Sequence, residues 1–169
     1  MFSYILGNLY SIKEVYHPEK TLWTETDFDI MSWHDCPVHG LLFDKENKLL
    51  FDIDYLFRWV LTEDKRKYKF WISPCTLVFE NVYNIVFESD YTTIIIDNIS
   101  RENPQRPKNV EHIKKDLEYD WLVETTAGVI CFKSVGFKQY VRQAPVLTEM
   151  QELDLKIRNG INFNQISFA

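Results

Sequence analysis

The stretch KLLFDIDYLFRWV, residues 48–60, decides the fold class of this chain, because apolar and polar residues alternate along most of it. Successive side chains of a β-strand point to opposite faces of its sheet. An extended chain would therefore separate these residues into two sets. One face would carry Phe51, Ile53, Tyr55, Phe57 and Trp59, and the other Asp52, Asp54, Leu56 and Arg58. The pattern predicts a long, half-buried strand whose acidic residues face solvent.

The segments around this strand also have β character. The apolar run 40–44 and the turn residues 45–47 precede it, so residues 38–44 and 48–59 are expected to form a β-hairpin. A charged loop, 62–67, follows. Beyond it, β-branched and aromatic residues, which suit a pleated surface, dominate a series of short segments. These predicted strands are 68–73, 76–81, 83–88, 91–97, 119–126, 128–134 and 136–143.

Only two segments in the second half of the chain favour helix. A polar loop at 100–109 ends in an asparagine that could cap a short helix over 110–117. Thr148 and Gln151 have the spacing of a capping box, and an Asn-Gly pair ending at Gly160 would stop the helix that follows.

Many short strands with little helix predict a mainly β (α+β) protein. We expect an antiparallel sandwich or barrel-like sheet with one or two short helices. The length suits a single domain over 1–169, with residues 1–29 as an N-terminal extension that packs on it. Within this extension, the apolar residues before His17-Pro18 could form a short helix or a covering strand.

The charge balance restricts the partners. The chain has 25 acidic and 19 basic residues, which gives a net charge of −6. Binding to nucleic acid depends on lysine and arginine, so we expect no nucleic-acid partner unless the basic residues cluster. An anionic membrane surface is disfavoured for the same reason, and no apolar run approaches the ~18 residues of a membrane span. An acidic surface suits a basic protein partner.

The cysteines indicate a reducing compartment. Cys36, Cys75 and Cys131 are odd in number and widely spaced, without a CxxC pair, so no disulfide framework is expected. The N-terminal apolar residues have no preceding basic residue, which does not fit a signal peptide. We expect a cytoplasmic protein.

The segment WHDCPVH, residues 33–39, holds the densest group of metal-ligating residue types. His34 and Cys36 are two positions apart and would point the same way from a strand, as zinc ligands do. His39 would point away from His34, and the group lacks the paired spacing of zinc motifs. One hypothesis is a β-barrel whose pocket holds a small ligand or metal ion and has hydrolytic activity. Its residues would be Trp33, His34, Asp35, His39, Asp52 and Asp54.

A catalytic interpretation of the same segment makes Cys36 a nucleophile, with His34 or His39 as its base and Asp35 as the orienting group. It requires a lowered thiol pKa, and no signature of known hydrolases occurs in the chain.

A second catalytic interpretation uses Asp52 and Asp54 as an acid pair, as in glycosidases. A structural role needs fewer assumptions. Asp35 would accept backbone N–H groups at the start of a strand, and Cys36 would fill an apolar gap. We predict no catalytic residue and no cofactor.

Several segments resemble a group of small, uncharacterised bacterial proteins. They are SWHDCPVHGLLFD (32–44), LLFDIDYLFRWV (49–60), FWISPCTLVFENVYNIVFES (70–89), GFKQYVRQAPVL (136–147) and RNGINF (158–163). In that group a Trp/Phe-His-Asp motif precedes a strand and a P-x-T-L-V-F-E-N-V segment follows. Some bacterial proteins with a similar His-Asp motif are immunity proteins of toxin systems. The resemblance implies no established catalytic residue. Together with the net charge of −6, it favours a non-enzymatic interaction protein whose acidic surface, near Asp52 and Asp54, binds a basic protein, as an immunity protein binds its toxin.

Overall fold

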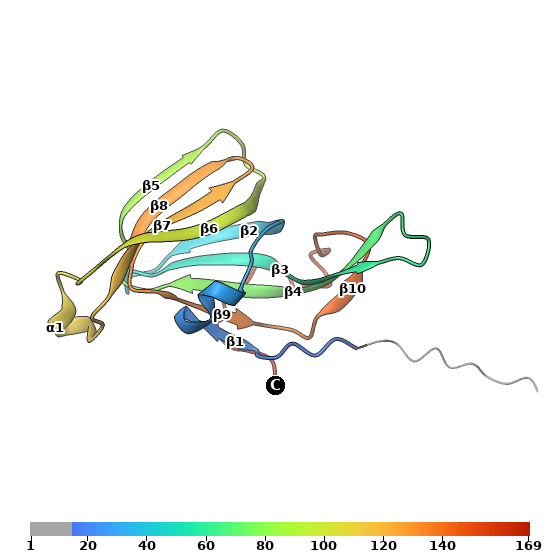
Figure 1. Ribbon diagram of the computed structural model, residues 1–169, viewed down its shortest axis with the longest axis horizontal. Coiled ribbons are helices and arrows are strands. Elements are labelled where there is room, and N and C mark those ends of the chain that lie inside the picture. The colour runs from blue at the N-terminus through green and yellow to red at the C-terminus, as the bar shows by residue number, and fades with distance from the viewer. Residues whose placement is uncertain (1–14) are drawn as a thin grey trace, which may run out of the picture.

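The computed structural model describes residues 15–169, which form ten strands and two short helices (Figure 1). The strands are β1 (Leu22–Thr24), β2 (Cys36–Phe43), β3 (Leu49–Leu61), β4 (Tyr68–Phe79), β5 (Tyr83–Ser89), β6 (Ile94–Gln105), β7 (Glu118–Thr125), β8 (Gly128–Ser134), β9 (Phe137–Val141) and β10 (Val146–Thr148). The helices are the 3-10 helix η1 (Glu25–Ile30) and α1 (Val110–Ile113). No helix between residues 15 and 169 has the length and apolar content needed to cross a membrane. Most of the helix or strand expected before His17-Pro18 lies outside the described residues.

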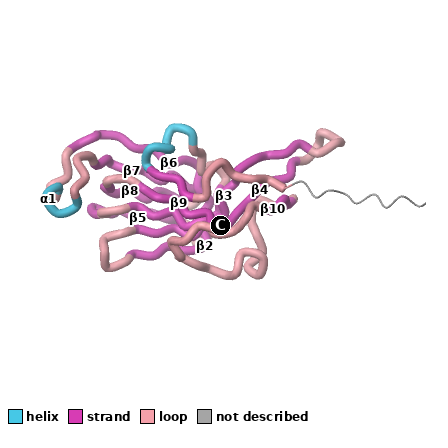
Figure 2. The backbone as a smooth tube through the Cα atoms, turned by 90° about the horizontal axis from the view of Figure 1, so that it is seen from below, coloured by secondary structure: helices cyan, strands magenta, loops and turns pink. Residues whose placement is uncertain are grey.

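The strands form one antiparallel sheet in the order β1-β9-β4-β3-β2-β6-β7-β8-β5, with β10 paired to β4 beside this path. The sheet curls over itself without closing into a barrel (Figure 1 and Figure 2). Phe79 of β4 lies 5.0 Å from Trp121 of β7 between ring centroids, although three strands separate β4 from β7 in the sheet. The apolar core fills the space between these two halves. The prediction of an antiparallel, mainly β protein with short helices is confirmed.

The predicted hairpin is present as β2 and β3. Leu41 pairs with Phe51 and Phe43 with Leu49. The turn between them is held by Asp44, whose carboxylate accepts the backbone N–H groups of Glu46 and Lys48, both at 2.9 Å. A short side chain that binds the backbone two residues on is typical of such turns.

Strand β4 replaces the two strands predicted at 68–73 and 76–81, because Pro74 does not interrupt it. The Pro74 carbonyl accepts the backbone N–H of Arg142 at 3.0 Å, on the side of β9 and β10. A strand residue points its nitrogen and carbonyl to the same side, so the missing N–H lies there too. Strand β9 pairs only from Cys75 onward and β10 only up to Ile72. The proline therefore occupies a gap between two partners, where no ladder hydrogen bond is lost.

The polar segment predicted as a loop at 100–109 is mostly strand, since β6 continues to Gln105. A register shift between Glu102 and Gln105 accommodates Asn103, which has a φ of 51° and donates its amide to Asp120 at 3.0 Å. The helix predicted over 110–117 is only the single turn α1, because Lys114 adopts a left-handed conformation that ends it.

Residues 149–164, here called the C-terminal strap, are not the predicted helix but an irregular segment laid across β2 and β3. A single turn forms where the Asp154 carbonyl accepts the N–H groups of Ile157 and Arg158. Asn159 and Gly160, at φ of 59° and 75°, end this turn. Gly40 of β2 gives the strap room, because a Cβ there would lie 3.0 Å from the Phe163 ring.

Residues 22–30 of the predicted N-terminal extension pack on the sheet. Strand β1 pairs with β9, and η1 places Phe28 against Trp121 with ring centroids 5.3 Å apart. Arg101 of β6 stacks on Phe28 and forms an ion pair with Glu25. The segment thus joins β9 to β6 and β7 across the open side of the curled sheet.

Candidate functional site

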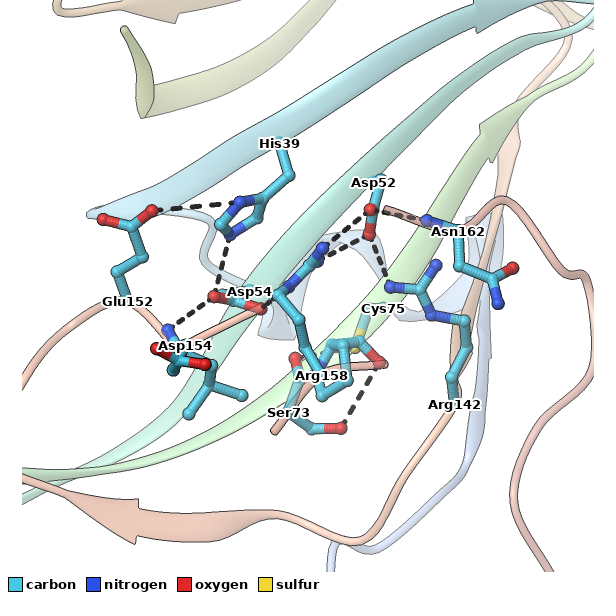
Figure 3. Close-up of polar contacts among 12 residues, drawn as sticks. His39, Asp52, Asp54, Ser73, Cys75, Arg142, Glu152, Asp154, Arg158 and Asn162 are labelled. Carbon is cyan, nitrogen blue, oxygen red and sulfur yellow. Dashed lines mark hydrogen bonds and ion pairs between the residues drawn. The ribbon is translucent and has the colours of Figure 1, made fainter. Parts of the chain in front are cut away.

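Two acidic side chains of β3 point away from the core and are buried beneath the C-terminal strap (Figure 3). Asp52 and Asp54 each have 0% exposure. Sequence analysis placed both on a solvent-facing side of the strand, and that placement was wrong. It failed because the strap covers this face of β3.

Asp52 is held by four donors. Arg158 donates two parallel hydrogen bonds to it, from Nη2 at 2.7 Å and from Nη1 at 2.9 Å. Arg142 donates to the same carboxylate from Nη2, and its Nη1 donates to Thr76 at 3.2 Å. The backbone N–H of Asn162 adds a contact at 2.9 Å. Such two-pronged arginine contacts fix geometry as well as supply energy.

Asp54 has a separate set of donors. Arg158 Nε donates to Oδ1 at 3.1 Å, and the backbone N–H of Leu153 donates to Oδ2 at 2.8 Å. His39 Nε2 lies 2.9 Å from Oδ2, so this nitrogen carries the donated proton. Burial alone would raise the pKa of Asp54, but the hydrogen bonds from His39 and Leu153 and the Arg158 charge hold that pKa below its usual value.

Arg158 is the centre of this group, because its guanidinium joins both carboxylates and is itself fully buried. Burial favours the neutral form, but the hydrogen bond to Asp52 and the charges of Asp54 and Asp52 outweigh it and raise the pKa of Arg158. Its Nη1 also donates to the Gly160 carbonyl at 2.8 Å. Two carboxylates thus face two guanidiniums, and each charge has a partner.

The structure divides the residues proposed for a pocket. Trp33 lies in the core, where its Nε1 donates to Gln139 at 2.8 Å. His34 is exposed and lies 3.1 Å from the Asp97 carbonyl through Nδ1. Asp35 accepts a hydrogen bond from the Gln151 side chain at 3.0 Å. His39 contacts Asp54 on the face of β3 opposite Trp33, with Asp52 on the same face, and His34 Nε2 lies 3.6 Å from an Asp35 carboxylate oxygen. Because Trp33 lies in the core and His34 is exposed, the six side chains do not form one concavity.

The cysteine and carboxylate arrangements do not fit the catalytic interpretations. Cys36 is fully buried, and burial raises the pKa of its thiol to about 12, so it stays protonated at neutral pH. A cysteine nucleophile needs the opposite shift. Asp52 and Asp54 are both buried and hydrogen-bonded to Arg158, so they do not form the open carboxylate pair of a glycosidase.

Within residues 15–169, no three histidine, cysteine, aspartate or glutamate side chains are arranged to hold a metal ion. The position between Asp52 and Asp54, where a cation would be attracted, is filled by the Arg158 guanidinium. The chemistry of this group is therefore that of a structural ion-pair network.

The outer side of the strap is apolar and acidic. Leu155, Ile157 and Ile161 are exposed, at 54–57% of their surface. Glu149 and Glu152 are also exposed, and Glu152 Oε1 lies 3.8 Å from His39 Nδ1. An open cleft beside the strap is lined by Val38, His39, Thr93, Ile94, Met150 and Glu152.

Sequence analysis connected neither arginine with Asp52 or Asp54. Arg158 and Arg142 lie 106 and 90 residues from Asp52 in the chain, so no local spacing connects them. The one available signal was a pair of aspartates in a strand whose other residues up to Leu56 are apolar, since such acids need either solvent or basic partners.

Comparison of the chain with protein-family models, with curated proteins and with solved structures found no match.

Proposed function

We propose that this protein is a non-enzymatic interaction protein that binds a basic protein through its C-terminal strap. One observation carries the proposal. A buried network centred on Arg158 anchors an irregular segment whose side chains Leu155, Ile157 and Ile161 are each more than half exposed. Irregular segments placed on a rigid scaffold are frequent binding sites.

The anchoring favours binding over a purely structural role for the strap. Apolar residues in place of Asp52, Asp54 and Arg158 would cover the sheet at a lower cost in free energy, because burying a charged group removes it from water. Paired charges instead fix one geometry for the segment. A preordered loop loses less conformational entropy when a partner binds. The network therefore supports a strap that is held ready for a partner.

The charges of the strap support a basic partner. The acids Glu149, Glu152 and Asp154 are exposed on it, whereas Lys156 is its exposed base. The whole chain carries a net charge of −6. Opposite potentials accelerate encounter, and exposed aliphatic side chains then supply apolar contact area. We propose that the partner is a toxin, which this protein inhibits as an immunity protein does. The three free thiols suit the reducing cytoplasm as the compartment in which the two meet.

A capture experiment with the purified chain tests this proposal. We expect wild type to retain a basic protein from a lysate of its host at low salt and to lose it as salt rises. The variant Ile157→Gln should retain much less, because it removes apolar contact area without changing charge. Ile30→Gln, at an exposed isoleucine outside the strap, is the matched control. Equal capture by both variants would contradict the proposal.

A further inference from the structure

The two edges of the sheet differ. Strand β1 is three residues long, and the C-terminal Ser167 donates to the Thr21 carbonyl next to it. Strand β5 is seven residues long, and among residues 15–169 it pairs only with β8. Its outer backbone groups thus form an open edge, visible at the end of the sheet in Figure 1.

The open edge is apolar. Ile85, Val86 and Phe87 are consecutive and are exposed at 40%, 50% and 48%. Soluble proteins usually protect a long edge with lysine, proline or a covering element. The segment Ile85–Ser89 has no lysine, arginine or proline, and Glu88 is its one charged residue. Such an edge is suited to pairing with another strand.

We propose that β5 pairs antiparallel with β5 of a second copy, so that two sheets join edge to edge in a symmetric dimer. The two-fold axis passes through Val86, which places Val86 opposite its own copy. Ile85 then lies opposite Phe87, and by symmetry this pair occurs twice. This interface is independent of the function proposed for the strap.

Side-chain complementarity selects a second copy as the occupant. In the Val86-centred register all pairs from Ile85 to Phe87 are apolar, and directly opposed apolar pairs stabilise a sheet. Glu88 lies opposite Asn84, whose amide can donate to the carboxylate, so no like charges are opposed. An axis through Phe87 is less favourable, because it would place the charged Glu88 opposite the apolar Val86. The left-handed φ of 53° at Asn84 and the register shift between Tyr83 and Val86 interrupt regular pairing beyond the Asn84–Glu88 pair and keep the contact short.

Sedimentation equilibrium of the full chain over a wide range of concentration tests the dimer. Wild type should show a reversible monomer–dimer equilibrium. Val86→Lys places two lysines opposite one another, so its dissociation constant should rise at least about tenfold. Ile30→Lys makes the same charge change at an exposed site outside β5 and should dimerise like wild type. Thermal melts would confirm that both variants fold.

A mixing experiment tests the register. Val86→Glu alone should also stay monomeric, but an equimolar mixture with Val86→Lys should recover a dimer, because opposite charges then face each other. Three results would overturn the proposal: a wild type that stays monomeric at its highest soluble concentration, a folded Val86→Lys that dimerises like wild type, or a mixture without recovery.

Discussion

The two faces of β3 are buried in different ways. On one face Phe51 and Ile53 pack into an apolar core, with Phe51 and Phe79 ring centroids 5.9 Å apart. On the other face Asp52 and Asp54 are equally buried but contact the guanidinium of Arg158. Apolar burial has no directional requirement. Hydrogen bonds between charged groups do have a directional requirement, and each donor needs its acceptor in one position. The core face thus builds the sheet, whereas the charged face fixes one segment in one position.

The largest expected effect comes from removing the shared partner of the two carboxylates. Arg158→Ala leaves Asp52 and Asp54 buried with fewer donors and should lower the free energy of unfolding by about 3–5 kcal/mol. Urea denaturation measures this loss. Lys156→Ala, two residues away and exposed, is the control and should change stability by less than about 0.5 kcal/mol. A loss in Arg158→Ala as small as that in the control would mean that the buried network contributes little to stability.

A smaller loss should follow from neutralising one carboxylate. Asp54→Asn keeps the side-chain shape but weakens the hydrogen bonds from His39, Leu153 and Arg158. We expect a decrease of about 1.5–3 kcal/mol in the free energy of unfolding, the range for hydrogen bonds to charged groups. If urea denaturation showed that Asp54→Asn leaves the free energy of unfolding unchanged or raises it, the ion pair between Asp54 and Arg158 would not stabilise the fold.

The apolar face should respond more weakly to a conservative change. Ile53→Val removes one methylene group from the core and should cost about 0.5–1.5 kcal/mol. The strap should stay protected from proteolysis in this variant, whereas in Arg158→Ala it should be cleaved first. Limited proteolysis with mapping of the cut sites separates the two cases. Strap cleavage in both variants would remove the distinction between the faces.

The smallest effect is a pH dependence. Because the pKa of folded Asp54 is below its usual value, the unfolded chain binds more protons as the pH falls through about 4. The contribution of Asp54 to stability is therefore complete above this pH and is lost below it. Urea denaturation from pH 7 to pH 3 should show a shallower acid slope for Asp54→Asn than for wild type. If stability fell with the same slope in both proteins, the pKa of folded Asp54 would not be lowered.

The sequence predicted the sheet better than the site. The period of two in residues 48–60 was sufficient for β3 and its hairpin, because side-chain alternation is a local property. The same alternation placed Asp52 on the solvent side, because nothing local indicates that a segment about 100 residues later covers it. The predicted helix after Thr148 failed for the same reason, since contacts of Leu153, Arg158 and Asn162 with β3 override the local capping signal.

Hydrogen–deuterium exchange of the strap tests most directly whether the charged face of β3 holds it in place. The N–H groups of Leu153 and Asn162, which donate to the buried carboxylates, should be protected in wild type. In Arg158→Met both should exchange much faster, while the N–H groups of β3 that pair with β4 stay protected. Unchanged protection of Leu153 and Asn162 in Arg158→Met, or no protection in wild type, would contradict the account.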